Sequence, residues 1–245
     1  MNKKIIAAAL IATLPTVGHS ERWEKGVTLY GWLPGMDGSI GTAYGDYNFS
    51  PSGSASSLID DLDMVFMGTF EAGKGRWRFI KDILYVDLSD KKATPFGVLF
   101  SDGKVDLAMW AVSGYLSYQV YESSTFSFDV AGGARYFDID MTTTLNAGTL
   151  PTESVSRDDS WIDPVVALRG EWKFSDKWSA TAFADIGGYV GESETWQVLG
   201  TVNYNFNEKW IGRFGYRHMD VSQTIDGVDV DIGLSGPVFG LAYRF

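Results

Sequence analysis

Apolar and polar residues alternate along most of the chain, and ten segments keep this alternation for the length of a β-strand. A period of two places successive side chains on opposite faces of a sheet, so each segment has one apolar face. Each also approaches or exceeds the roughly 9–11 residues that a tilted strand needs to cross a bilayer. The pattern therefore predicts an all-β fold, a transmembrane antiparallel β-barrel. The predicted strands are Lys25–Leu33, Met64–Gly73, Arg76–Leu88, Val105–Val120, Thr125–Asp140, Trp161–Phe174, Trp178–Val190, Thr195–Phe206, Trp210–Val221 and Gly233–Phe245.

The connections between these segments alternate between short turns and mostly longer loops. This alternation is typical of barrels that place short turns in the periplasm and longer loops outside the cell. With both termini in the periplasm the number of strands is even, so ten strands fit, and twelve would require an extra hairpin at Ser39–Phe49. The short turns are Ala72–Gly75, Tyr121–Ser124, Ser175–Lys177 and Asn207–Lys209, and the other connections are Pro34–Asp63, Ser89–Lys104, Met141–Ser160, Gly191–Glu194 and Ser222–Ile232.

The last strand is apolar on one face and ends on an aromatic residue. Pro237, Phe239, Leu241, Tyr243 and Phe245 share the apolar face. This strand resembles the closing strand of Gram-negative outer-membrane barrels, which the barrel-assembly machinery reads. The resemblance implies that Tyr243 and Phe245 form an assembly signal and that this machinery is a partner.

Residues 1–20 have the three parts of a secretory signal peptide. Lys3 and Lys4 give a charged start, Ile5–Leu14 an apolar run, and small residues a cleavage site. The apolar run is too short to span a bilayer as a helix. The sequence predicts export to the outer membrane, with 21–245 as a single barrel domain. The absence of cysteine excludes disulfides.

The chain is acidic. Its formal charge is −11, and removal of Lys3 and Lys4 with the signal peptide takes it to −13. This charge argues against nucleic acid as a partner, because phosphates need a basic surface. Outer-membrane lipid and lipopolysaccharide are the expected partners. Two acidic stretches, Asp60–Asp63 and Asp226–Asp231, either are simply solvated or contact divalent cations at the outer surface. Neither has EF-hand spacing, so no metal site and no cofactor are predicted.

Charged residues of both signs fall on the inward face of the predicted strands. Charges removed from bulk water persist only when they are paired and hydrogen-bonded. Two interpretations remain open: a salt-bridged core that plugs a narrow barrel, or a small selective pore with these groups in its wall. Alternation breaks at Lys81–Asp82, which predicts a β-bulge. The predicted lumen network is Glu71, Asp82, Asp129, Arg135, Asp163, Arg169, Glu171, Asp185, Arg213, Arg217 and Arg244.

Catalytic candidates are limited to His218 and Asp220, which share one face of a predicted strand. The pair resembles the Asp/His pair of omptin proteases, which are also ten-stranded barrels. However, this face also carries Trp210, Phe214 and Tyr216 toward lipid, and no second acidic pair is evident. A Ser–His lipid hydrolase would also have to use His218, and no serine motif lies beside it. The sequence therefore favours a protein without enzymatic activity.

Ten stretches spread over nearly the whole mature chain resemble a family of small, largely uncharacterised proteobacterial outer-membrane proteins. The resemblance implies a barrel in the outer membrane and no particular reaction. The predicted function is a structural or surface-exposed barrel with at most a narrow, plugged pore. The alternative is a membrane-embedded hydrolase, an omptin-like protease or lipid hydrolase, that uses His218. The stretches are Tyr30–Gly38, Leu62–Gly68, Phe70–Ala72, Lys74–Trp77, Asp82, Tyr85–Asp90, Gly133–Tyr136, Asp163–Val166, Leu168–Gly170 and Gly215–Arg217.

Overall fold

The computed structural model describes residues 22–42, 45–49, 62–93, 98–188 and 193–245. The predicted signal peptide lies outside these residues. The described residues form twelve β-strands and no helix, and every pairing between strands is antiparallel. None of them therefore builds a helix long and apolar enough to cross a membrane. The prediction of an all-β antiparallel barrel is confirmed.

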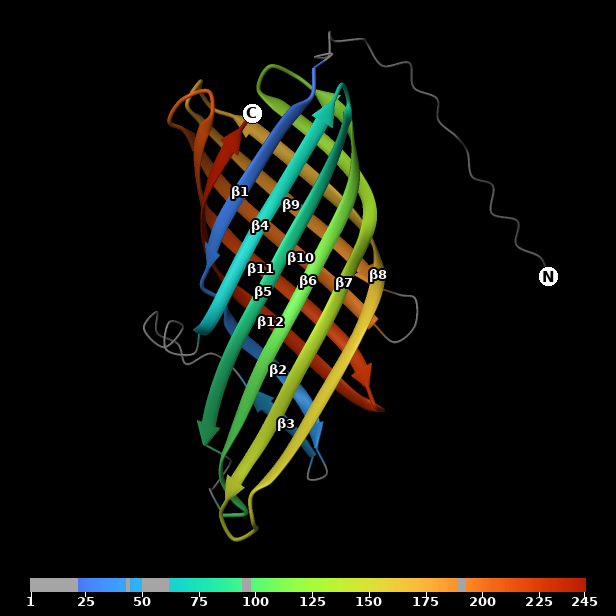
Figure 1. Cartoon of the computed structure of the whole chain (residues 1–245), viewed down its shortest axis with the longest axis vertical. Coiled ribbons are helices and arrows are strands. Elements are labelled where there is room, and N and C mark those ends of the chain that lie inside the picture. Colours follow the sequence, from blue (N-terminus) through green and yellow to red (C-terminus); the bar gives the residue numbers. More distant parts are fainter. Residues whose placement is uncertain (1–21, 43–44, 50–61, 94–97, 189–192) are drawn as a thin grey trace, which may run out of the picture.

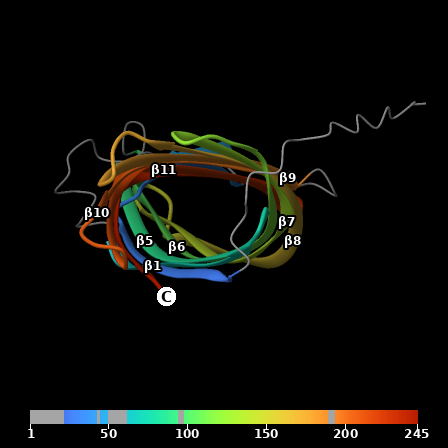
Figure 2. The same ribbon diagram turned by 90° about the horizontal axis from the view of Figure 1, so that it is seen from above.

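Ten of the twelve strands close into a ring, because β1 is hydrogen-bonded to both β4 and β12. Figure 1 shows these strands inclined to the long axis of the molecule, and Figure 2 shows that the ring is oval rather than round. The strands are β1 (Glu24–Trp32), β2 (Gly35–Thr42), β3 (Gly45–Phe49), β4 (Leu62–Lys74), β5 (Trp77–Ala93), β6 (Phe100–Glu122), β7 (Phe126–Ala147), β8 (Glu153–Lys173), β9 (Trp178–Gly188), β10 (Ser193–Asn205), β11 (Trp210–Ile225) and β12 (Val228–Arg244).

The remaining two strands, β2 and β3, form a hairpin that extends the ring at one end. After a break at Leu33 and Pro34 the chain leaves β1 and continues as β2 along β12, and β3 then pairs with β2. At this break a side chain at position 236 would collide with the Leu33 carbonyl oxygen. The close approach of β12 to the break therefore requires glycine at this position. The ring has ten strands, as the alternation predicted. The extra hairpin that a total of twelve strands would require is also present, outside the ring.

The two ends of the ring differ. We call the end that carries Glu24, Phe245 and the four short turns the terminal end, and the end that carries the β2–β3 hairpin the distal end (Figure 1). At the distal end the strands run further than the sequence predicted, and β6, β7 and β8 reach 23, 22 and 21 residues. The inward face stays apolar there, with Met141 and Leu145 buried on β7, so strand pairing continues into the predicted loops. Between β11 and β12 only Asp226 and Gly227 remain as a turn, both with positive φ.

The outward face carries a band of exposed apolar side chains bounded by aromatic residues. Near the terminal end, Trp77 stacks on Tyr118 at a centroid distance of 4.8 Å. Toward the distal end, Tyr85 stacks on Trp110 at 4.7 Å. Beyond this second ring of aromatic residues the outward face becomes polar; Asp138, for example, accepts a hydrogen bond from the Tyr136 hydroxyl at 3.0 Å. The band has the form of a membrane-facing surface.

The β-bulge predicted at Lys81–Asp82 is absent. The β4–β5 register runs without a shift through Thr69↔Asp82 and Phe70↔Lys81. Lys81 lies exposed on the outward face and Asp82 turns inward. Regular pairing is possible here because the long methylene stem of a lysine can cover apolar surface while its ammonium group reaches toward a polar layer.

Candidate functional site

The middle of the barrel interior holds a buried ion pair between Arg135 and Asp185. Their closest atoms, Arg135 Nη2 and Asp185 Oδ2, are 2.6 Å apart, and neither side chain has exposed surface. The Tyr115 hydroxyl donates to the same carboxylate oxygen at 2.7 Å and accepts from Arg135 Nη2 at 2.8 Å. Arg135 also donates from Nε to Ser113 at 2.8 Å and from Nη1 to Thr195 at 3.0 Å. Three strands, β6, β9 and β10, thus supply the hydrogen bonds that a buried guanidinium requires.

A second set of ion pairs lies between this layer and the terminal end. Arg169 contacts Asp129 at 3.4 Å and Glu171 at 3.2 Å. Glu71 receives Arg213 at 3.7 Å and Arg78 at 3.3 Å. Arg78, Glu71, Glu171 and Arg213 keep about a fifth to a quarter of their side-chain surface exposed, so water reaches this layer from the terminal end.

Two residues of the predicted lumen network have partners that the sequence did not indicate, and a third forms no ion pair among the described residues. Arg217 pairs with Asp82 at 3.1 Å, and its guanidinium lies 5.3 Å from the ring of Trp32. Asp163 pairs with no arginine among the described residues; it accepts from the Trp161 indole at 3.0 Å and from the Ser193 hydroxyl at 2.5 Å. Arg244 lies exposed at the terminal end, and its side chain forms no ion pair in the described part of the chain.

The distal half of the interior is apolar, which the sequence reading missed. A single cluster of buried apolar side chains from β1, β2, β4, β5, β6, β7, β11 and β12 occupies it. The sequence carries a signal for this core, since the segments around Leu84 and Leu107 are apolar on both faces, which is typical of a strand covered on both sides. Leu84, Val86, Met109, Phe137, Met219 and Leu234 have no exposed surface.

The Arg135 layer and the apolar distal half leave little or no exposed surface on their inward side chains. A water-filled channel would leave exposed surface on the inward side chains that line it. Arg135 has none, and the buried apolar residues of the distal half keep only between 0% and 9% of their surface exposed.

The two catalytic candidates lie on the outward face, where the sequence placed them. His218 Nδ1 is hydrogen-bonded to the hydroxyl of Ser235 on the adjacent strand β12, at 2.5 Å. Its ring stacks on Trp196 of β10 with 4.5 Å between centroids. No hydrogen bond joins His218 to Asp220 in the described residues. The sequence could not indicate Ser235, because the contact depends on the register between β11 and β12 rather than on proximity along the chain.

Acidic side chains lie on the distal side of this pair. Asp220 pairs with Gly233 across β11 and β12. The carboxylate of Asp37 on β2 lies close to the same glycine, because a Cβ added to Gly233 would be 2.9 Å from Asp37 Oδ2. In the predicted cation stretch Asp226–Asp231, Asp231 instead accepts from Ser222 at 2.6 Å. No group of three metal-ligating side chains occurs in the described residues. The other stretch, Asp60–Asp63, lies outside the residues whose side chains are described.

Asp102 lies at the distal end, outside the apolar band, and its pKa is lowered by its neighbours. The amide of Asn146 donates a hydrogen bond to Asp102, and Lys91 pairs with it at 3.3 Å. These contacts hold the pKa of Asp102 below its usual range. The carboxylate therefore stays ionised on the polar surface of the distal end.

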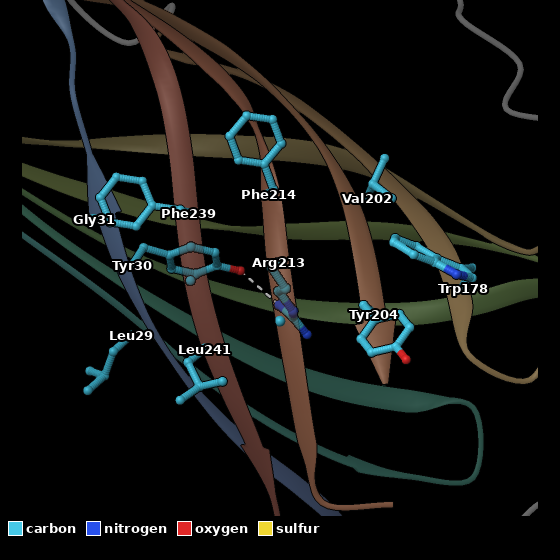
Figure 3. Close-up of a pocket in the computed structure, with 12 residues that line it drawn as sticks. Leu29, Tyr30, Gly31, Trp178, Val202, Tyr204, Arg213, Phe214, Phe239 and Leu241 are labelled. Atoms are coloured by element: carbon cyan, nitrogen blue, oxygen red, sulfur yellow. Dashed lines mark hydrogen bonds between the residues drawn. The ribbon is translucent and has the colours of Figure 1, made fainter. Parts of the chain in front are cut away.

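An apolar groove of about 710 Å³ lies in the outward face below the His218–Ser235 pair. Figure 3 shows its side chains on neighbouring strands, including Phe214 of β11 and Phe239 of β12. On the inner side of this wall Arg213 donates to the Tyr30 hydroxyl at 2.8 Å, drawn as a dashed line. The groove and the pair thus share strands β11 and β12.

The chain is similar in structure to the outer membrane protease OmpT of Escherichia coli, with a TM-score of 0.60 and 10% identity over 94% of this chain and 99% of that chain. It also matches Neisserial surface protein A (TM-score 0.37, 12% identity, 94% and 100% covered) and the attachment invasion locus protein Ail of Yersinia pestis (TM-score 0.34, 12% identity, 92% and 100% covered). At these identities the likeness shows the fold alone, that of outer-membrane β-barrels. No protein-family model and no curated protein matches the sequence.

Proposed function

We propose that the protein is a non-conducting outer-membrane barrel that presents a rigid distal extension at the cell surface. The terminal end would face the periplasm and the distal end the exterior. The observation that carries this proposal is the burial of the inward side chains, of which Arg135 and Phe137 have no exposed surface. The outward apolar band between two aromatic rings supports the position in the membrane.

Two partners accompany this proposal. Tyr243 and Phe245 lie on the outward face at the terminal end, with Phe245 exposed, where the barrel-assembly machinery would reach them during export. Lipopolysaccharide, with its divalent cations, would surround the acidic outward face of the distal end, which includes Asp138 and Asp231.

An omptin-like protease is less well supported. His218 and Asp220 turn toward the lipid-facing side, so they do not line a cleft at the mouth of the barrel. The likeness to OmpT shows the fold and not the reaction.

The closed interior predicts no steady single-channel current when the purified protein is inserted into planar bilayers. A double Arg213→Ala/Arg217→Ala variant should stay equally silent, because the apolar distal half remains intact above the removed charges. Large, stable openings in the wild type would contradict the proposal. A current in the variant alone would mean that the charged layer, rather than the apolar one, closes the barrel.

A closed barrel also predicts heat-modifiable migration in gels. The ring through β1 and β12 leaves no free edge in its membrane part, so the folded form should resist detergent until it is boiled. Identical migration before and after boiling, with recovery in the soluble periplasmic fraction, would argue against the membrane position.

A further inference from the structure

We infer that the outward face of β10, β11, β12 and β2 carries a lipid acyl-ester hydrolase site, with Ser235 as nucleophile and His218 as general base. The substrate class is a glycerophospholipid with an ammonium headgroup. This inference rests on the proposed membrane position but not on the closed interior. It stands on the order of three features along these strands: an acidic rim, the Ser–His pair and an apolar groove.

The Ser–His pair has the geometry of a nucleophile and its base. Ser235 Oγ and His218 Nδ1 are 2.5 Å apart, which is within the reach that proton transfer requires. Trp196 packs against the imidazole ring in a tilted contact, with 4.5 Å between ring centroids. Both side chains are half-buried on the outward face, at the boundary between the apolar band and the polar distal surface. Lipid esters lie at this boundary between acyl chains and headgroups.

The groove lies where the acyl chain of such an ester would run. On β11 the outward side chains Phe214 and His218 are four residues apart, and on β12 Phe239 and Ser235 are also four apart. At about 3.3 Å per residue this places the groove roughly 13 Å below the pair, within the reach of one long acyl chain. An acyl chain is therefore the occupant that fits an apolar groove turned toward the membrane.

The acidic rim selects the headgroup. Asp220 and Asp37 lie one outward position further toward the distal end than His218 and Ser235. A lipid whose ester is at Ser235 and whose chain is in the groove would place its headgroup beside these carboxylates. Carboxylates attract an ammonium group and repel a phosphate that lacks one, so phosphatidylethanolamine fits better than an anionic lipid.

The reaction balances with these groups and water alone. Ser235 Oγ attacks the acyl carbonyl while its proton passes to His218 Nδ1. The ester C–O bond then breaks, and His218 returns the proton to the lysophospholipid oxygen. Water hydrolyses the acyl-serine by the same proton route and releases a fatty acid. Turnover should be slow, because a sheet commits its N–H groups to neighbouring strands and leaves few donors for the developing oxyanion.

Two assays on the folded full-length protein in mixed micelles test the site. The first is covalent labelling by an alkyl fluorophosphonate, mapped by mass spectrometry. The second is release of fatty acid from phosphatidylethanolamine. We expect a label on Ser235, no label or release in Ser235→Ala, and a rate lowered about 100-fold or more in His218→Gln. Ser156→Ala removes an exposed outward serine on β8 and should behave as wild type.

A separate substitution tests the role of the groove. Val202→Trp would fill it from an exposed, lipid-facing position, so folding should be retained. Release of a long acyl chain should fall while cleavage of a butyryl ester persists. Equal loss with both chain lengths would overturn the role of the groove. Absence of label from Ser235 in protein that still shows heat-modifiable migration would overturn the hydrolase while leaving the barrel proposal intact, and release from lipopolysaccharide alone would overturn the substrate class.

Discussion

Replacement of Asp185 by alanine should destabilise the barrel more than the loss of any exposed charge. The substitution leaves Arg135, whose side chain has no exposed surface, without this carboxylate. Removal of one partner from a buried ion pair costs about 3–5 kcal/mol, because the remaining charge is stranded. The free energy of unfolding, measured by urea titration in detergent with tryptophan fluorescence, should fall by this amount.

Two controls separate charge from packing in this experiment. Lys104→Ala breaks the exposed pair with Asp106 and should change stability little, since exposed pairs contribute about 0–1 kcal/mol. The double variant Arg135→Met/Asp185→Leu removes both charges and should recover much of the loss, because apolar replacements of a buried pair are often neutral. Equal effects of Asp185→Ala and Lys104→Ala would mean that water hydrates Arg135.

The sequence predicted the fold well because the membrane imposes a strict pattern. Strands that face lipid must be apolar on one side, and this side could be followed to Phe245 without any contact information. Strand ends were less predictable. On β7 the predicted end at Asp140 is polar but outward, while the inward Met141 continues the buried face and extends the strand to Ala147.

The candidate sites were predicted only in part because they depend on register. The inward position of Arg217 followed from alternation, but its pairing with Asp82 joins strands β11 and β5, which lie apart in the ring. Similarly, alternation placed His218 on the lipid-facing side, whereas its contact with Ser235 requires the alignment of β11 with β12. The alternation of apolar and polar residues predicts which face each side chain occupies, but its neighbours on adjacent strands depend on the register of the sheet.

The apolar distal half also contributes to stability. Phe137 has no exposed surface, packs against Trp161 with 5.0 Å between ring centroids, and lies on the inward face of β7. Replacement of a fully buried phenylalanine by alanine costs about 3–5 kcal/mol through lost transfer energy and the cavity left behind. Phe137→Ala should lower the free energy of unfolding by this amount.

Phe214→Ala is the matched control, because it removes the same side chain from the opposite face. Phe214 is 65% exposed on the outward wall, where lipid or detergent would take the place of the ring. Its removal should leave the unfolding midpoint nearly unchanged. If the two substitutions had equal effects, the distal interior would be hydrated and the barrel open. If Phe137→Ala alone destabilises, the inward aromatic ring is packed in an apolar interior while the outward ring is solvated by lipid or detergent.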